Sequence, residues 1–194
     1  MHLEKLMKKG KILSTKEMIL CALFTALIAV GAFIKIPIPY VPITLQFLFT
    51  NIAGLLLGRK KGLISVGLYI FLGLAGLPIF TQGGGPGYIF QPTFGYVLGF
   101  ALGTWLAGLI AEHGGDSIKT YIIAGLANFA AVFTLGLLHF YLILNFYLKT
   151  PIGIEKLFAV CFLPFALGDI ALVIISAILA KRLRPVALKG LTAS

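Results

Sequence analysis

Fifty consecutive residues, from Gly62 to Ala111, contain no charged side chain. A helix that crosses the ~30 Å hydrocarbon core of a bilayer needs about 20 mostly apolar residues. This run is therefore long enough for two crossings and a connection. Its middle, residues 82–87, has the sequence Gln-Gly-Gly-Gly-Pro-Gly, which is too rich in glycine and proline to be helical. We expect the run to divide there.

The composition of the whole chain excludes an ordinary soluble domain. Of its 194 residues, 59% are apolar and 11% are charged, and the mean hydropathy is +1.03. A soluble domain carries about 45–50% apolar and about 25% charged residues. The formal charge of +10 does not indicate a nucleic-acid partner, because the cations lie in short clusters between long neutral runs, as in a polytopic membrane protein. Cys21 and Cys161 have no Cys or His nearby, which argues against a disulfide or a metal site.

Charge-free segments predict an all-α membrane protein with six transmembrane helices. Two helices come from the long neutral run, and Asp169 interrupts the last of the other four. Those four segments are Met18–Ile34, Ile36–Gly58, Thr120–Leu148 and Leu157–Ala180. The chain is thus expected to be a single integral membrane domain over residues 1–194. Its predicted parts are a basic N-terminal segment lying on the inner leaflet (1–16), a helix bundle (about 17–181) and a cytoplasmic tail (182–194).

The positions of Lys and Arg orient these helices, because cytoplasmic loops carry an excess of them. If the N-terminus is cytoplasmic, 13 of the 16 Lys and Arg fall on the inner side, and only Lys35, Lys149 and Lys156 fall on the outer side. We therefore expect both termini to be cytoplasmic. The 13 inner residues are Lys5, Lys8, Lys9, Lys11, Lys16, Arg59, Lys60, Lys61, Lys119, Lys181, Arg182, Arg184 and Lys189.

The two long outer connections, residues 35–42 and 81–92, are rich in Pro and Gly and poor in charge. Non-helical backbone survives at membrane depth only where protein buries it or a cavity lies beside it. We expect these loops to fold over the outer mouth of the bundle and cover a pocket. For either loop alone, a proline-stiffened connector is the alternative interpretation.

Small residues at helical spacing allow helices to pack closely in lipid. The first helix has a short patch of this kind, Ala22 and Ala26, which fits either internal packing or a docking face for another membrane protein. The fourth helix has a longer ladder, which predicts an internal helix–helix seam. Its members, each four residues apart, are Gly95, Gly99, Gly103, Ala107 and Ala111.

Asp169 is the only acidic residue inside a predicted helix core. It precedes Lys181 by 12 residues, so at 1.5 Å per residue it lies about 18 Å from the inner end. Pro164, five residues earlier, loosens the helix at the same level. Ionisable residues within the membrane usually face a cavity or the bundle interior. Asp169 is therefore a candidate for ligand binding, with pairing to an Asn or Tyr of a neighbouring helix as the alternative.

Four further polar residues lie in pairs where an outer loop enters the bundle: Thr44 with Gln46, and Thr93 with Tyr96. Such positions fit an apolar-walled small-molecule pocket with a few convergent polar groups. No catalytic motif such as HExxH or Gly-x-Ser-x-Gly occurs, so binding is favoured over chemistry. The remaining polar residues of the spans, each more typical of an interhelical hydrogen bond, are Asn51, Tyr69, Asn128 and His139.

Several segments of the sequence resemble the BioY family, the biotin-specific substrate-binding (S) components of energy-coupling factor (ECF) transporters. They are Pro39-Tyr-Val-Pro-Ile-Thr-Leu-Gln46, Gly54-Leu-Leu-Leu-Gly58, Tyr69-Ile-Phe-Leu-Gly-Leu-Ala-Gly-Leu-Pro-Ile-Phe80, Pro92-Thr-Phe-Gly-Tyr-Val-Leu-Gly-Phe100 and Pro164-Phe-Ala-Leu-Gly-Asp169. The likeness covers about residues 17–181.

The resemblance implies a biotin pocket near the outer face of an S-component bundle and no enzymatic activity. It also implies three partner subunits: a transmembrane coupling subunit and two cytoplasmic ATPases. ATP is then used only by these partners, and no cofactor is expected here. Ala22 and Ala26 match the family's docking motif, and Asp169 matches its binding acid. The other substrate-binding candidates are Gln46, Thr44, Tyr96 and Asn128.

The sequence departs from the family at one informative position. Family members typically carry a Lys three residues after the binding acid, where this chain has Leu172. Which cation meets the biotin carboxylate therefore stays open, with Lys35, Lys149 and Lys156 as candidates. An S component for another vitamin, an intramembrane enzyme and a scaffold are the alternative functions.

Overall fold

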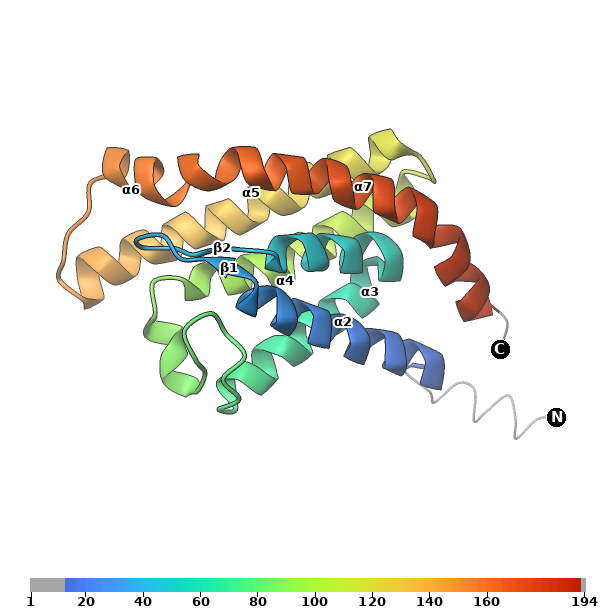
Figure 1. Ribbon diagram of the computed structural model, residues 1–194, viewed down its shortest axis with the longest axis horizontal. Coiled ribbons are helices and arrows are strands. Elements are labelled where there is room, and N and C mark those ends of the chain that lie inside the picture. Colours follow the sequence, from blue (N-terminus) through green and yellow to red (C-terminus); the bar gives the residue numbers. More distant parts are fainter. Residues whose placement is uncertain (1–12, 193–194) are drawn as a thin grey trace.

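Helices make up most of residues 13–192, the part of the chain that this computed structural model describes, and they pack into one elongated bundle (Figure 1). A capping box starts the first of them: the Ser14 hydroxyl accepts from the Glu17 N–H, and the Glu17 carboxylate accepts from the Ser14 N–H. The elements are α2 (Thr15–Phe33), β1 (Lys35–Ile36), β2 (Ile43–Thr44), α3 (Gln46–Leu74), the 3₁₀ helix η1 (Pro86–Phe90), α4 (Phe94–His113), α5 (Ile118–Leu142), the π-helix η2 (Ile143–Tyr147), α6 (Ile154–Cys161) and α7 (Leu163–Thr192).

Four of the described helical segments are long and apolar enough to cross a membrane. They match the predicted first, fourth, fifth and sixth helices to within a few residues at most ends. Charged residues lie at or near most ends of these segments, whereas Phe94–His113 begins after the Gly- and Pro-rich loop that divides the neutral run. The four segments are Thr15–Phe33, Phe94–His113, Ile118–Tyr147 and Leu163–Pro185.

The predicted second and third helices form the two arms of α3, which folds back on itself. Gly58 has a left-handed φ of 79° inside this element, a backbone conformation that favours glycine. If α3 were straight, Gln46 and Tyr69 would lie about 35 Å apart at 1.5 Å per residue. Instead, Gln46 Nε2 donates to the Tyr69 hydroxyl at 2.7 Å. Neither arm alone has the length of the four helices above.

The small-residue ladder of α4 lies at the seam between α4 and α5, which confirms the predicted internal packing. A Cβ added at Gly99 would lie 2.6 Å from Val132 Cα, and one at Gly95 or Gly103 would overlap His139 or Asn128 of α5. Close packing of small residues supplies the van der Waals contact that holds helices together in lipid.

Three ion pairs gather at the end of the bundle where α2 begins and α7 ends, together with the α3 bend and the α4–α5 loop (Figure 1). Asp116 lies in the α4–α5 loop and accepts a hydrogen bond from the Tyr121 hydroxyl of α5. This bond lowers the pKa of the Asp116 carboxyl, and the nearby Lys181 ammonium lowers it further. Predicted inner-side cations therefore meet at one end. The ion pairs are Lys61–Glu17, Arg59–Glu112 and Lys181–Asp116.

Two predicted terminal segments are only partly tested. Residues 1–12 of the predicted basic segment lie outside the described residues. The segment predicted as a tail, 182–194, continues α7 in helical form as far as Thr192, with Pro185 inside the helix.

We predict that Gly99→Ala destabilises the protein by about 1–3 kcal/mol, because the new methyl group would press on the Val132 backbone. Gly67→Ala is the matched control, since its added methyl group meets nothing within 4 Å and alanine favours a helix by up to about 1 kcal/mol. Thermal unfolding of both variants in detergent measures the difference. Equal melting temperatures would contradict the proposed tightness of the seam.

Candidate ligand-binding site

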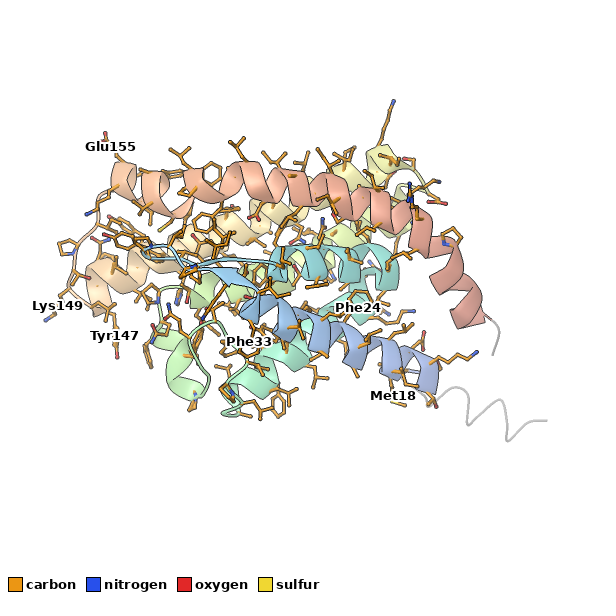
Figure 2. The ribbon with its side chains drawn as sticks, viewed as in Figure 1. Met18, Phe24, Phe33, Tyr147, Lys149 and Glu155 are labelled. Carbon is orange, nitrogen blue, oxygen red and sulfur yellow. The ribbon has the colours of Figure 1, made fainter. Side chains whose placement is uncertain are left out.

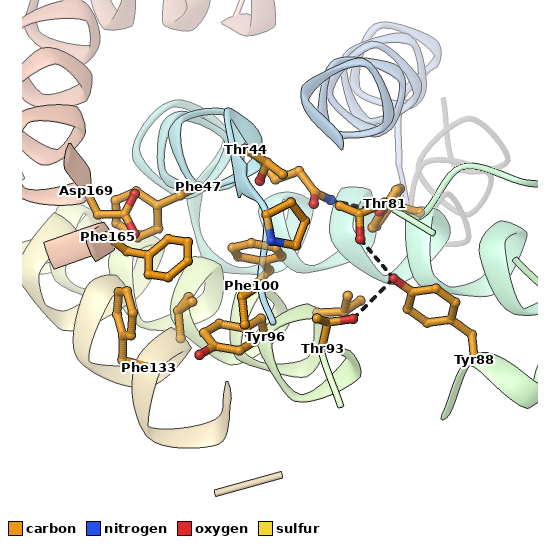
Figure 3. A pocket seen from close by; sticks show the side chains of 16 residues that line it. Thr44, Phe47, Thr81, Tyr88, Thr93, Tyr96, Phe100, Phe133, Phe165 and Asp169 are labelled. Atoms are coloured by element: carbon orange, nitrogen blue, oxygen red, sulfur yellow. Dashed lines mark hydrogen bonds between the residues drawn. The ribbon is translucent and has the colours of Figure 1, made fainter. Parts of the chain in front are cut away.

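A cavity of about 580 Å³, including the part open to solvent at its mouth, lies beside the β1–β2 hairpin (Figure 3). It lies away from the end of the bundle where the ion pairs gather. Its walls come from all the major elements except α2 and α6. The lining residues are Val41, Pro42, Thr44, Gln46, Phe47, Tyr69, Thr81, Tyr88, Thr93, Tyr96, Val97, Phe100, Val132, Phe133, Phe165 and Asp169.

The β1–β2 hairpin forms part of the cavity wall. Its strands pair antiparallel, with Lys35 opposite Thr44. Tyr40 at its tip has a left-handed φ of 72°. Its ring packs edge-on against that of Phe140 of α5, with 6.3 Å between the ring centroids. The descending side of the hairpin then contributes Val41 and Pro42 to the lining. The first of the two predicted covering loops therefore does border a pocket.

The second covering loop supplies a chain of hydroxyl groups. The Tyr88 hydroxyl lies 3.0 Å from Thr81 Oγ1 and 3.4 Å from Thr93 Oγ1 (Figure 3). Thr93 was predicted to line a pocket, but Thr81 and Tyr88 were not. Their position beside the glycine tract of a covering loop was the only sequence signal that pointed to them.

Gln46, the first residue of α3, is fixed by the second arm of the same helix. Its amide donates to the Tyr69 hydroxyl, which in turn donates to the Ile79 carbonyl at 3.2 Å. Gln46 is 3% exposed, yet it lines the cavity. The fold-back of α3 therefore positions this predicted site residue.

Pro164 interrupts the predicted sixth helix and creates a contact for Tyr96. Because proline has no N–H and clashes with the preceding turn, the helix breaks at Phe162, between α6 and α7. The Phe165 N–H bonds to the Phe162 carbonyl, which leaves the Cys161 carbonyl to accept from the Tyr96 hydroxyl at 3.0 Å. Tyr96 is thereby held at the cavity wall.

Asp169 lines the cavity from α7, one turn beyond Phe165. It is 9% exposed, and among the described groups none forms a hydrogen bond or ion pair with its carboxylate. Figure 3 shows its carboxylate beside Phe47 and Phe165. A buried carboxylate with apolar neighbours is costly unless it meets a donor. The cavity is the place from which a ligand can supply one.

Asn128 is the predicted site residue that does not line this cavity. It is fully buried, and its amide donates to Asn51 Oδ1 at 3.3 Å. The Asn51 amide donates in turn to the Ser176 hydroxyl. Asn128 lies one helical turn before Val132, a lining residue, so it sits one layer beyond the cavity wall.

Ala22 and Ala26 are both exposed on the outer face of α2. Figure 2 shows Met18 and Phe33 pointing away from the bundle, whereas Phe24 turns toward it and is buried. Among the described residues the alanine patch is therefore not covered, which favours the docking interpretation over internal packing.

Comparisons with known proteins agree with this arrangement. The profile of the BioY family matches residues 5–189. The chain belongs to the BioY family. It is 43% identical to a probable biotin transporter BioY of Lysinibacillus sphaericus, over 88% of this chain and 87% of the relative. It is 38% identical to the biotin transporter BioY of Thermotoga maritima, over 87% of this chain and 96% of that protein.

A BioY-like fold is also found among solved structures. The crystal structure of the S-component for biotin from an ECF-type ABC transporter superposes with a TM-score of 0.75 and 30% identity, covering 88% of this chain and 91% of the other. Together with the four apolar helices, these matches establish a multi-pass membrane protein of the BioY family.

We predict that Tyr96→Phe lowers stability by about 1–3 kcal/mol, because the buried Cys161 carbonyl would lose its donor. Tyr141→Phe is the matched control, because the Tyr141 hydroxyl bonds to none of the described residues. The free energies of unfolding of the two variants in detergent would be compared. If Tyr141→Phe is equally destabilising, Tyr96 does not hold the break between α6 and α7.

Proposed function

We propose that this chain is the biotin-binding S component of an ECF-type vitamin uptake transporter. It captures biotin in the cavity beside Asp169 and delivers it inward with ATP-driven partner subunits. The observation that carries the proposal is the unpaired Asp169 carboxylate in an otherwise mostly apolar cavity, in a chain of the BioY family.

The chemistry of biotin fits the two kinds of surface in the cavity. Its ureido ring has two N–H donors, and an ionised carboxylate accepts such donors in bonds stronger than those between neutral groups. Its sulfur-containing ring is apolar and suits the aromatic wall formed by Phe47, Phe133 and Phe165. Gln46, Thr44 and Tyr96 supply further polar contacts. Asn128 supports the wall from outside the cavity.

We place six crossings in the membrane by counting both arms of α3 along with the four longer helices. The loops around the cavity then face outward, and both termini face the cytoplasm. This orientation is supported by the charge distribution, since Lys61, Arg59 and Lys181 all form ion pairs at the end remote from the cavity.

The partners are a transmembrane coupling subunit and two cytoplasmic ATPases, and ATP is consumed only by the ATPases. The chain itself is a transport component and not an enzyme, and it needs no cofactor. The exposed patch of Ala22 and Ala26 is the docking face for the coupling subunit, because small residues allow close approach of two helices.

We predict that Asp169→Asn weakens biotin binding by at least about 1.5 kcal/mol, the lower end for losing a charge-assisted hydrogen bond. Glu155→Gln removes an acid of α6 that is exposed and does not line the cavity, and its affinity should match the wild type. Titration of purified protein with labelled biotin gives both values. Unchanged affinity in a folded Asp169→Asn protein would move the site elsewhere.

Competition separates biotin from other vitamins. Unlabelled biotin should displace the label, while thiamine and riboflavin should not. If wild-type protein shows no saturable biotin binding but retains another of these vitamins, the chain is an S component of different specificity.

We predict that Ala22→Trp abolishes co-purification with the coupling subunit, because the large ring would hold the two helices apart. Biotin binding should be unaffected, since α2 does not line the cavity. Ala130→Trp places the same side chain on an exposed position of α5 and should assemble normally. Normal assembly of the Ala22→Trp protein would assign docking to a different face.

A further inference from the structure

The cavity has a second polar end, separated from Asp169 by aromatic side chains. Figure 3 shows Asp169 on one side of the cavity and Thr81, Tyr88 and Thr93 on the other, with Phe100 between them. A ligand that extends from one end to the other must therefore carry polar groups at both of its ends.

The hydroxyl chain at this second end has one proton to offer to a ligand. Each of the three hydroxyl groups has a single donor hydrogen, but only two hydrogen bonds join them. The Tyr88 hydroxyl can donate in only one of these bonds, so the other must be donated by a threonine. One hydroxyl hydrogen of the three is therefore left over, and it suits an acceptor such as a carboxylate.

Lys35 brings a positive charge to the same end. Its Nζ donates to the backbone carbonyl of Thr81 at 2.6 Å, and its Cα pairs across the hairpin with that of Thr44. Both Thr81 and Thr44 line the cavity. A lysine ammonium has three donor hydrogens, so Lys35 can keep its bond to Thr81 and still donate to a ligand.

We propose that Lys35 and the Thr81–Tyr88–Thr93 hydroxyl chain form a carboxylate-binding subsite. This inference rests on the proposed function, in which the ureido ring of biotin lies against Asp169. The valerate carboxylate then reaches the opposite end and meets the ammonium. Leu172 lies one helical turn from Asp169, at the end of the cavity where the ureido ring lies, so the cation for the carboxylate comes from the covering hairpin.

The other two outer cations do not share these contacts. Figure 2 shows Lys149 at the end of the bundle opposite Met18, with its side chain projecting away from the helices. Lys156 is exposed on α6 and, like Lys35, is not itself a lining residue. Neither is hydrogen-bonded to a residue of the cavity within the described part of the chain.

The test compares biotin with biotinamide, in which a neutral amide replaces the carboxylate. Dissociation constants for both ligands would be measured with wild-type protein, Lys35→Met, Lys35→Arg and the control Lys156→Met. We expect Lys35→Met to weaken biotin binding about tenfold or more, the loss of one charge-assisted bond, and to change biotinamide binding little. Lys35→Arg should keep the preference for biotin, and Lys156→Met should behave as wild type.

Three outcomes would overturn the subsite. If Lys35→Met weakens the binding of biotin and of biotinamide equally, Lys35 only links the two covering loops through its bond to Thr81. Loss of the biotin preference in Lys156→Met would assign the carboxylate to that residue, and an unchanged preference in Lys35→Met would leave Lys35 without a role. Failure of the wild type to bind either ligand would instead overturn the proposed function.

Discussion

Bilayer hydrocarbon offers no water to a broken helix, so each interruption of the backbone needs a partner from elsewhere in the protein. The chain is interrupted at Gly58 and at Phe162. The bend at Gly58 lies at the charged, exposed end of the bundle, where water reaches it, and there the Arg59 N–H also donates to the Glu112 carboxylate at 2.8 Å. Before Phe162, the Cys161 carbonyl accepts from Tyr96. The first interruption brings Gln46 to Tyr69, and the second holds Tyr96 at the wall, so both breaks position residues of the cavity.

Asn128 and Asp169 are both buried and polar, and their different surroundings illustrate why residue type alone does not identify a site. Asn51, Asn128 and Ser176 bond to one another across α3, α5 and α7. They act as interhelical links of the kind that hold membrane bundles together. Asp169 lies two turns before Ser176 on the same helix, but its carboxylate faces the cavity without a donor from the described residues. A residue in the cavity is available to a ligand, and a residue one layer away is consumed by packing.

The sequence predicted four of the helices and an internal seam on α4, because charge-free length and glycine spacing directly limit packing in lipid. The segment predicted as the second helix, Ile36–Gly58, instead contains most of the hairpin and only the first arm of α3. It also predicted Asp169, Gln46 and the two loops around the cavity. It could not separate Asn128 from the cavity residues, since one helical turn decides which layer a side chain joins. Thr81 was missed because it reaches the cavity through an irregular loop. Such a loop has no regular spacing of residues from which its tertiary contacts could be predicted.

The helix with the proposed docking face and part of the cavity wall belong to one continuous stretch of chain. The exposed alanine face belongs to α2, which ends at Phe33, and β1 begins two residues later with Lys35. The Leu45 N–H bonds to the carbonyls of Gly31 and Ile34, so the base of the hairpin is locked to the last turn of the helix. Displacing the end of α2 must therefore either move the hairpin that borders the cavity or break these bonds. The same short segment thus connects the exposed alanine face of α2 to the wall of the cavity.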